Sequence, residues 1–443
     1  MSAKESINPT IDETHNPNLR SWVESANQKD TDFPIQNLPV GVFRRRNELS
    51  PRLGVAIGDQ ILDLAAVGEV GLLAELSEDL QAACGASNLN SMMALGRESA
   101  LLLRRQISQL LRYNSDSSPP ESKILLPISE AQLLLPASIG DYTDFYASIF
   151  HATNVGKLFR PDNPLLPNYK YIPVAYHGRA SSIVASGTPI RRPVGQSKRP
   201  EESVPSFAAS KLLDYEVEVG LFVGAGNALG ESITIDRAED HIFGLCLVND
   251  WSARDIQAWE YQPLGPFLGK SFATTISPWV VTLDALAPFR CAAMKRNSDD
   301  PAPLAYLACS TNSQFGGINL TVEVLLHSVQ MREMGIEPLP ISRASFTQMY
   351  WTIAQMVTHH TSNGCNLRSG DLLASGTVSG ADEGSQGSLL EITRRGEQPI
   401  QLPSGETRSF LADGDEVILR GYCEKEGYVK IGFGECRGKI FSY

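Results

Sequence analysis

An acidic strand is the feature of this sequence best suited to chemistry. The segment Leu213–Val223 alternates with period two, which places Asp214, Glu216 and Glu218 on one face and apolar side chains on the other. Carboxylates at alternate positions repel one another, so in an interior they must take up protons, face water or share a cation. Hard divalent ions prefer oxygen ligands. The alternation therefore predicts a metal platform or a solvated edge strand, and the strand alone favours the edge.

Polar side chains also gather in three other segments. Asp141–His151 holds two acids, two tyrosines and a histidine ahead of a glycine-containing loop. Asn249–Tyr261 combines carboxylate, guanidinium, amide and phenol groups after an apolar run, and Gly265–Phe272 adds Lys270. Taken singly, Asp250 suits a helix N-cap and the histidine suits a structural role. Taken together, the segments supply anion-stabilising groups beside groups that bind a hard cation.

Three motif-like segments do not support other enzyme classes. Gly224–Gly230 lacks the glycine spacing and the following helix of a dinucleotide-binding turn, so we interpret it as a plain turn. Gly376–Gly380 does not centre Ser379 as a nucleophile elbow requires, which disfavours a serine hydrolase. His359 and His360 end a helical pattern, where capping of the last carbonyls is expected rather than metal binding.

Composition excludes several kinds of partner. The chain has 443 residues, 42% of them hydrophobic, and a formal net charge of -12, so it lacks the concentrated basic surface that nucleic acid or an anionic membrane requires. Its seven cysteines form no C-x-x-C pair and several lie in apolar surroundings, which is typical of reduced thiols. No secretory or transmembrane segment is visible, so we expect a cytoplasmic protein.

The N-terminal part is expected to form a small barrel behind a polar extension. Residues 1–31 are rich in polar and charged types, which predicts an arm or a disordered leader. Short strand patterns at Val40–Phe43, Leu53–Ile57 and Gln60–Leu64 are separated by turn signals. Helical spacing of apolar residues follows over Leu89–Leu111.

The remainder of the chain reads as mainly β. The breaker-rich run Asn114–Glu121 predicts a domain boundary between residues 114 and 140. Beyond it, Gly, Pro and short strand patterns dominate, with one clear helical pattern over Ala344–Val357. We therefore expect an α+β chain with an N-terminal domain over 32–136 and a larger domain over 137–443.

Six segments carry a family resemblance. They are Asp141–Tyr146, His151–Gly156, Tyr176–Ser182, Asn249–Gln257, Gly269–Phe272 and Asp371–Thr377. In their order and spacing, from about Asp32 to Phe441, they closely resemble the fumarylacetoacetase family, which acts last in tyrosine and phenylalanine breakdown. The resemblance implies an SH3-like N-terminal barrel, a β-sandwich roll that carries the active site, and a homodimer.

The resemblance also implies a role for each site residue. The metal ligands, for Ca²⁺ or Mg²⁺, fall on Asp144, Glu216, Glu218 and Asp250, with Lys270 and Thr274 as further magnesium contacts. The general base falls on His151, its orienting acid on Glu391, and the anion-stabilising trio on Arg254, Gln257 and Lys270. The substrate contacts fall on Tyr146, Arg160, Tyr176, Gln257, Tyr261 and Thr377.

These roles predict metal-dependent hydrolysis of a carbon–carbon bond in a small β-diketo acid. An acylpyruvate hydrolase, or a related decarboxylase or isomerase, is the alternative within the same superfamily, because the carboxylates alone serve all of them. A cation-binding protein without catalysis is the alternative from another class. The full-length resemblance disfavours the first, and a base beside anion-stabilising groups disfavours the second.

Overall fold

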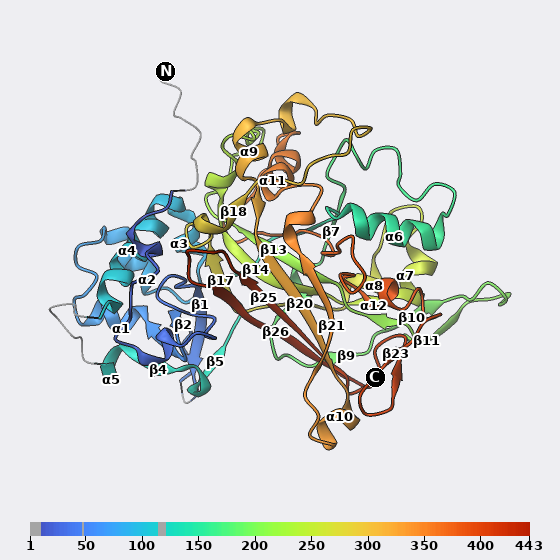
Figure 1. Cartoon of the computed structure of the whole chain (residues 1–443), viewed down its shortest axis with the longest axis horizontal. Helices are drawn as coiled ribbons and strands as arrows, with labels where there is room; N and C mark the ends of the chain where they lie inside the picture. The colour runs from blue at the N-terminus through green and yellow to red at the C-terminus, as the bar shows by residue number, and fades with distance from the viewer. Residues whose placement is uncertain (1–9, 47, 114–120) are drawn as a thin grey trace.

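A 13-stranded sheet runs through the computed structural model, which describes residues 10–46, 48–113 and 121–443 (Figure 1). Ten of its strands follow the order β4-β3-β2-β1-β17-β14-β13-β22-β6-β7, and β5, β8 and β16 pair off this path. Their bounds are β1 Val40–Arg45, β2 Arg52–Ile57, β3 Gln60–Asp63, β4 Leu125–Pro127, β5 Ala131–Leu133, β6 Tyr142–Phe145, β7 Ala175–His177, β8 Ile183–Ala185, β13 Val217–Val223, β14 Ile242–Asp250, β16 Thr274–Ile276, β17 Trp279–Thr282 and β22 Leu372–Ala374.

The N-terminal strands confirm the three strand patterns seen in the sequence. Strands β1, β2 and β3 form an antiparallel meander, and the β2–β3 turn places Gly58 at a φ of 58°, a conformation that suits glycine. Strand β1 also pairs with β17, so this meander continues the sheet of the larger domain. Five helices pack around it: α1 Leu64–Glu69, α2 Glu78–Cys84, α3 Asn90–Ala94, α4 Gly96–Leu111 and α5 Glu121–Ile124.

The described part of the polar extension is an ordered arm and not a disordered leader. Val23 and Ala26 are buried, and the ring of His15 donates from Nε2 to the carbonyl oxygen of Asp284 at 2.7 Å. Arg104 donates from Nε to the Thr14 hydroxyl at 3.1 Å. The arm is thus bound to both domains by buried polar contacts that its composition did not reveal. Residues 1–9 of the extension and 114–120 of the expected boundary lie outside the described residues.

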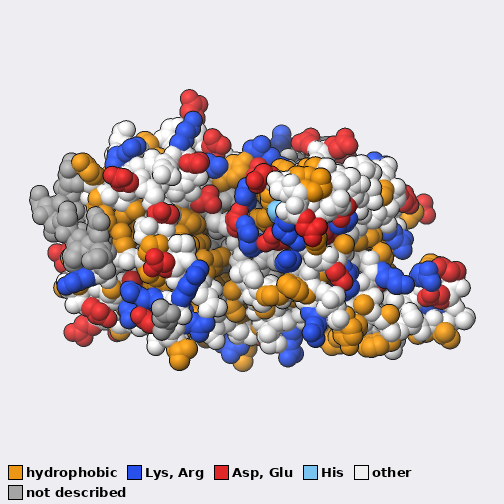
Figure 2. All heavy atoms as spheres, turned by 90° about the horizontal axis from the view of Figure 1, so that it is seen from below, with side chains coloured by type: hydrophobic (Ala, Val, Ile, Leu, Met, Phe, Trp, Pro, Cys, Tyr) orange, Lys and Arg blue, Asp and Glu red, His pale blue; other side chains and the backbone are white. Residues whose placement is uncertain are grey.

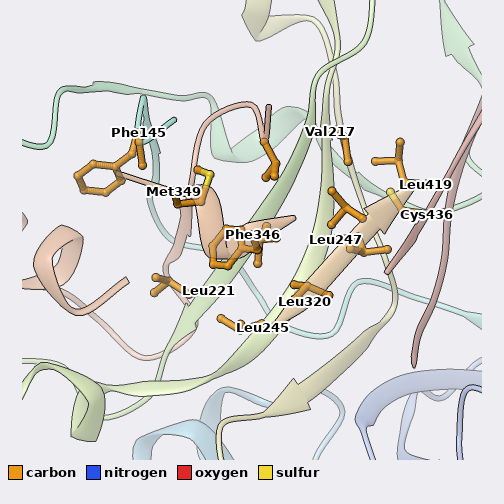
Figure 3. Packing of buried hydrophobic residues seen from close by; sticks show 14 of the residues in the cluster. Phe145, Val217, Leu221, Leu245, Leu247, Leu320, Phe346, Met349, Leu419 and Cys436 are labelled. Atoms are coloured by element: carbon orange, nitrogen blue, oxygen red, sulfur yellow. The ribbon is translucent and has the colours of Figure 1, made fainter. Parts of the chain in front are cut away.

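A second sheet of five strands, in the order β21-β20-β25-β26-β9, packs against the large sheet. Figure 3 shows Leu245 and Leu247 of β14 beside Leu320 of β20 and Leu419 of β25, all of them buried in one core cluster. Two stacked sheets confirm the predicted β-rich sandwich. The bounds are β9 Ile190–Arg191, β20 Leu320–His327, β21 Leu339–Ser345, β25 Glu416–Cys423 and β26 Ile431–Phe441.

Both helical predictions need correction. The pattern over Leu89–Leu111 forms two helices, because the chain turns at Gly96, whose φ is 78°. The pattern over Ala344–Val357 begins too early: its first residues finish strand β21, and the helix α11 spans Ile353–Thr361. Thr352 starts that helix through a capping box with Gln355, a signal that apolar spacing alone does not use.

His359 and His360 lie in the last turn of α11, as predicted, but their rings contact side chains. His359 Nδ1 lies 2.9 Å from the Tyr306 hydroxyl, and His360 Nε2 lies 2.9 Å from the Thr143 hydroxyl. They therefore connect the helix to its neighbours and do not cap its carbonyls.

Short helices gather at one end of the long strands (Figure 1). They are α6 Ile149–Phe159, α7 Arg254–Glu260, α8 Leu268–Ser271 and α12 Leu389–Ile392. Next to them, the hairpin of β10 (Val194–Ser197) and β11 (Ser206–Ala209) extends outward (Figure 1). The remaining α-helices and strands are α9 Ser310–Phe315, α10 Val329–Glu333, β12 Leu213–Asp214, β15 Ser252–Ala253, β18 Arg290–Cys291, β19 Gly317–Ile318, β23 Ile400–Gln401 and β24 Thr407–Arg408.

The distribution of surface charge and the character of the helices can be compared with the expectation that nucleic acid and membranes are not partners. On the face shown in Figure 2, basic and acidic side chains are interspersed over both halves of the molecule. Within the described ranges, no helix combines the length and the apolar character needed to cross a bilayer.

The packing of helix α6 generates a stability prediction. A Cβ on Gly156 would lie 2.0 Å from the carbonyl oxygen of Pro164, so Gly156→Ala must push the following loop away. We expect the free energy of unfolding to fall by about 1–3 kcal/mol, measured by urea denaturation. The matched control is Gly68→Ala in helix α1, where the nearest atom is 4.0 Å away. That change should stabilise by about 0.5–1 kcal/mol, and equal effects of the two substitutions would contradict the packing argument.

Candidate active site

Three carboxyl groups meet where neighbouring strands of the large sheet end. Glu218 lies near the start of β13 and Asp250 ends β14, which pairs antiparallel with it. Asp144 lies on β6, which is joined to β13 through the strand β22 between them. One oxygen of each side chain lies within 4.8 Å of the others, and all three residues are buried. Asp250 therefore belongs to a strand end and is not the N-cap of α7, which begins at Arg254.

The electrostatic environment of this carboxylate trio favours a bound cation. Burial and the charge of Asp250 raise the pKa of Asp144 well above its usual range, and burial and Asp144 do the same to the pKa of Glu218. Asp144 Oδ1 and both Glu218 carboxylate oxygens accept no hydrogen bond from the described residues. Buried oxygens without partners in a set of three acids fit a hard divalent ion such as Ca²⁺ or Mg²⁺.

Glu216 stands apart from the trio, because its carboxylate faces two cations. Arg254 Nη2 lies 2.8 Å from Glu216 Oε1, and Lys270 Nζ lies 2.5 Å from both Glu216 Oε2 and Asp250 Oδ2. Burial alone would raise the pKa of Glu216, but Lys270 and Arg254 outweigh it and hold this pKa below its usual value. Burial acts to lower the pKa of Lys270, but Asp250 and Glu216 raise it above its usual value.

Two predicted metal contacts are placed differently from the trio. The ammonium of Lys270 has no lone pair for a metal while it is protonated, so here it acts as a charge partner. The hydroxyl of Thr274, opposite Asp250 in the β14–β16 register, lies 3.5 Å from Asp250 Oδ1. A cavity of about 200 Å³ reaches Asp250 and Thr274 from a side lined by His177 and Arg179.

His151 lies in the first turn of α6 and is held by Glu391. Ser148 caps this helix by accepting from the His151 backbone N–H at 3.2 Å. His151 Nδ1 lies 2.6 Å from Glu391 Oε2, and both side chains are buried. Because a carboxylate accepts, Nδ1 carries a proton, and Nε2 is the ring nitrogen that faces away from Glu391. His151 keeps Glu391 low in pKa, although burial acts in the opposite direction.

Three residues that sequence reasoning missed hold Glu391 in place. Asn154 donates from Nδ2 to Glu391 Oε1 at 2.9 Å, and the hydroxyls of Ser379 and Ser388 donate to Oε2 at 3.0 and 2.9 Å. Ser388 also caps α12, with the Ser-x-x-Glu spacing of a capping motif. That spacing was readable in the sequence, whereas the contacts of Asn154 and Ser379 depend on the tertiary fold.

The predicted substrate contacts line one cavity of about 410 Å³ beside these groups, which is large enough for a small diacid. The Tyr146 ring packs edge-on against His151 with centroids 5.2 Å apart, and the Tyr176 hydroxyl donates to Asp250 Oδ2 at 2.9 Å. Leu165, Leu166 and Tyr169 are further walls that the sequence did not indicate. The predicted substrate contacts that line this cavity are Tyr146, Arg160, Tyr176, Gln257, Tyr261 and Thr377.

Two family models match nearly the whole chain. The fumarylacetoacetase N-terminal model matches residues 36–136, and the fumarylacetoacetate hydrolase C-terminal model matches residues 142–441. The chain belongs to the fumarylacetoacetate hydrolase family. Among its relatives, the fumarylacetoacetase of Homo sapiens is 51% identical over 93% of this chain and 97% of its own length. That of Caenorhabditis elegans is 52% identical, over the same shares of the two chains. That of Arabidopsis thaliana is 48% identical over 95% of this chain and 98% of its own.

A solved structure supports the fold of this family member. The fumarylacetoacetate hydrolase of psychrophilic Exiguobacterium antarcticum has a TM-score of 0.50 and 18% identity, covering 92% of this chain and all of that one. At this identity the likeness concerns the fold alone. The family resemblance predicted from motifs is thus confirmed, while the role of each site residue stays a prediction.

The carboxylate trio generates a prediction on metal binding. Because folding raises the pKa of these three acids, they bind more protons in the metal-free folded protein than in the unfolded chain, so their contribution to stability falls as pH rises above about 4. A divalent ion removes this penalty. At 100 times the dissociation constant, Ca²⁺ or Mg²⁺ should stabilise chelator-treated protein by about 2.7 kcal/mol, seen as a higher Tm.

Glu218→Gln separates this effect from general charge screening. The variant should lose the metal-induced rise in Tm, since it removes a carboxylate of the trio. The exposed Glu424→Gln changes the same charge on the surface and should keep the rise. An undiminished rise in Glu218→Gln would show that the trio does not hold the ion.

Proposed function

We propose that this protein hydrolyses 4-fumarylacetoacetate to fumarate and acetoacetate. The observation that carries the proposal is the pairing of His151 with Glu391 on the wall of a cavity that also contains Arg254 and Lys270. Relatives called fumarylacetoacetase, about half identical over almost the whole chain, support the same reaction. The site must stabilise two anions during this reaction, a tetrahedral oxyanion and an enolate.

The first step is attack by water on the carbonyl next to the fumaryl double bond. His151 Nε2 takes the proton of this water, while Glu391 on Nδ1 stabilises the imidazolium that forms. Ile149, the first residue of α6, packs against the core cluster between the two sheets, so the histidine lies on a helix held by packing. The hydroxide oxygen becomes bonded to the carbonyl carbon, and the former carbonyl oxygen becomes the oxyanion.

Arg254, Gln257 and Lys270 would stabilise this oxyanion. Gln257 Oε1 accepts from Arg254 Nη1 at 3.2 Å, so its amide N–H groups are left to donate into the cavity. Arg254 and Lys270 are both held as cations by the buried acids beside them. Removal of one such donor typically raises the barrier by about 3 kcal/mol.

Collapse of the tetrahedral adduct breaks the bond between its carbon and the neighbouring methylene. The bond's electron pair passes to the methylene carbon as an enolate, and the imidazolium of His151 returns the proton to that carbon. Asp144, Glu218 and Asp250, with Glu216 as the proposed fourth ligand, would hold a Ca²⁺ or Mg²⁺ ion that supplies Lewis-acid stabilisation to the diketone oxygens. The products are one carboxylic acid and one methyl ketone, as hydrolysis requires.

Arg160 supplies a seat for a terminal carboxylate of the substrate. It ends helix α6, is half-buried on the cavity wall, and has no acid partner among the described residues. Its Nη2 donates to the carbonyl oxygen of Pro164 at 3.4 Å, and its Nε has no partner among the described residues. A guanidinium without an acid partner can bind a carboxylate through charge-assisted hydrogen bonds. Tyr146, Tyr261 and Thr377 add hydroxyls along the same cavity.

The quaternary state and location belong to the same proposal. Leu264 is 97% exposed and Phe267 67% exposed, which supports coverage of this rim in a homodimer. Light scattering at micromolar concentration should give twice the chain mass of 48.3 kDa. All seven cysteines are free thiols, which supports a reducing compartment such as the cytoplasm.

Direct turnover tests the reaction. Purified protein mixed with fumarylacetoacetate should remove the absorbance of the conjugated diketone and release one fumarate and one acetoacetate per substrate. Chelator should abolish this turnover, and Ca²⁺ or Mg²⁺ should restore it. Cleavage of acylpyruvates in place of fumarylacetoacetate would select the acylpyruvate hydrolase alternative, and cleavage of neither would leave a protein that only binds cations.

His151→Ala tests the general base. The variant should fold, keep the metal-induced rise in Tm and lose about 100- to 10,000-fold in kcat, because only the proton transfer is removed. The matched control is His327→Ala, which removes a half-buried histidine whose Nε2 donates to the carbonyl oxygen of Ile336, away from the cavity. Near-wild-type turnover of His151→Ala would remove this residue from the role.

A further inference from the structure

Asp214 is a buried carboxylate that the proposed reaction does not use. Its side chain is fully buried, and Tyr215 separates it from Glu216 in the chain. Oδ2 accepts from Arg254 Nε at 2.9 Å and lies 2.8 Å from Arg254 Nη2. The same oxygen accepts from the backbone N–H of Leu390 at 3.0 Å, and Oδ1 accepts from that of Leu389 at 2.8 Å.

These contacts join the two halves of the proposed catalytic machinery. Leu389 and Leu390 form the first turn of α12, and the next residue is Glu391, which holds His151. One carboxylate therefore ties the anion-stabilising arginine to the turn that positions the base. The chain of contacts runs from Arg254 through Asp214 and α12 to Glu391 and His151, and every member is buried.

We propose that Asp214 is a positioning residue, which sets the place of Arg254 relative to His151. The inference rests on the proposed function, because it assigns how the base and the oxyanion donor are kept in register. Asp214 does not line the cavity, so it acts through Arg254 and does not touch substrate. A displacement of about 1 Å in such a group can reduce a rate by about 100-fold.

The contacts of Asp214 suit a side chain whose two oxygens both accept hydrogen bonds. The two oxygens accept four N–H hydrogen bonds: one from Arg254 Nε, two from the α12 backbone and one from the neighbouring Tyr215 at 2.9 Å. Arg254 Nη2 adds an ion pair at 2.8 Å. An amide at the same place would turn an NH₂ group toward donors. Among the described residues, Arg254 would then keep Glu216 and Gln257 as side-chain partners. Of these two, Glu216 pairs with Ser388, the N-cap of α12, through its backbone and not through the carboxylate that holds Arg254.

Steady-state kinetics of Asp214→Asn test the proposal. Fumarylacetoacetate turnover should fall by about 100-fold in kcat with KM within about threefold of wild type, since the loss concerns the oxyanion and not substrate binding. The metal-induced rise in Tm should persist. An unchanged kcat, or a loss confined to KM, would overturn the proposal.

Asp415→Asn is the matched control for a purely structural effect. Asp415 is also fully buried, accepts from Arg408 at 2.8 and 3.1 Å and from the backbone N–H of Ala412 at 2.8 Å, and lies away from the cavity lining. This variant should lower Tm and leave kcat unchanged. If both variants reduce kcat in proportion to their loss of stability, Asp214 has only a structural role.

A double-substitution cycle tests whether Asp214 acts through Arg254. Arg254→Ala alone and the double variant with Asp214→Asn should have the same kcat within about threefold, because the positioned group is already absent. Losses that multiply would overturn the proposal.

Rescue by small cations provides a test even if Asp214→Asn does not fold. In Arg254→Ala the acid remains in place, so added guanidinium should restore turnover with saturation, while methylammonium of equal charge should not. Equal rescue by the two ions, or no rescue by either, would contradict a binding site shaped for a guanidinium.

The failure of this inference can be told apart from the failure of the proposed function. Wild-type protein that cleaves no diketone overturns both, whereas Asp214→Asn with the turnover of wild type overturns the inference alone.

Discussion

The site depends on one constraint: its buried acids outnumber its permanent cations. Arg254 and Lys270 neutralise one side of the group, where they bridge Glu216 to its neighbours. They do not reach Glu218, whose oxygens are left without hydrogen-bond donors among the described residues. An isolated charge in an interior is very unfavourable, so that side must bind protons or a metal ion. The buried acids are Asp144, Asp214, Glu216, Glu218, Asp250 and Glu391.

The fold is what makes this unfavourable arrangement possible. Strands β13 and β14 are buried on both faces, with one core cluster between the two sheets and another toward the N-terminal domain. Their backbones are therefore held by packing that has nothing to do with charge, and the acids are placed by strand register. The opposing groups come from short helices at the same end of the strands (Figure 1). A rigid sheet thus carries most of the acids, while helices carry His151, Arg254 and Lys270.

Much of this could be predicted from the sequence where a pattern was local. Period-two alternation predicted one strand over Leu213–Val223, but the structure divides it into β12 and β13, with Glu216 between them in an isolated bridge to Ser388. Glu216 and Glu218 are both buried, which excludes the solvated edge. Local patterns failed where tertiary contacts decide: Ala344 completes a strand although apolar residues at helical spacing follow it. Asn154 illustrates the remainder, since nothing in its own segment indicates that it binds an acid 237 residues away. Distant segments were assembled only through the family motifs.

Glu216 and Glu218 show why alternation cannot separate roles. They are two residues apart in the chain, yet Lys270 and Arg254 hold the pKa of Glu216 below its usual value, while burial and the other acids of the trio raise that of Glu218. The difference comes from which side chains of other elements reach each position. Asp214 and Glu216 together hold the guanidinium of Arg254. Arg254 therefore lies on the side of these acids and not beside the carboxylate trio. The same acidic face is thereby divided between a seat for an anion and a seat for a cation, as a reaction that passes through an oxyanion and an enolate requires.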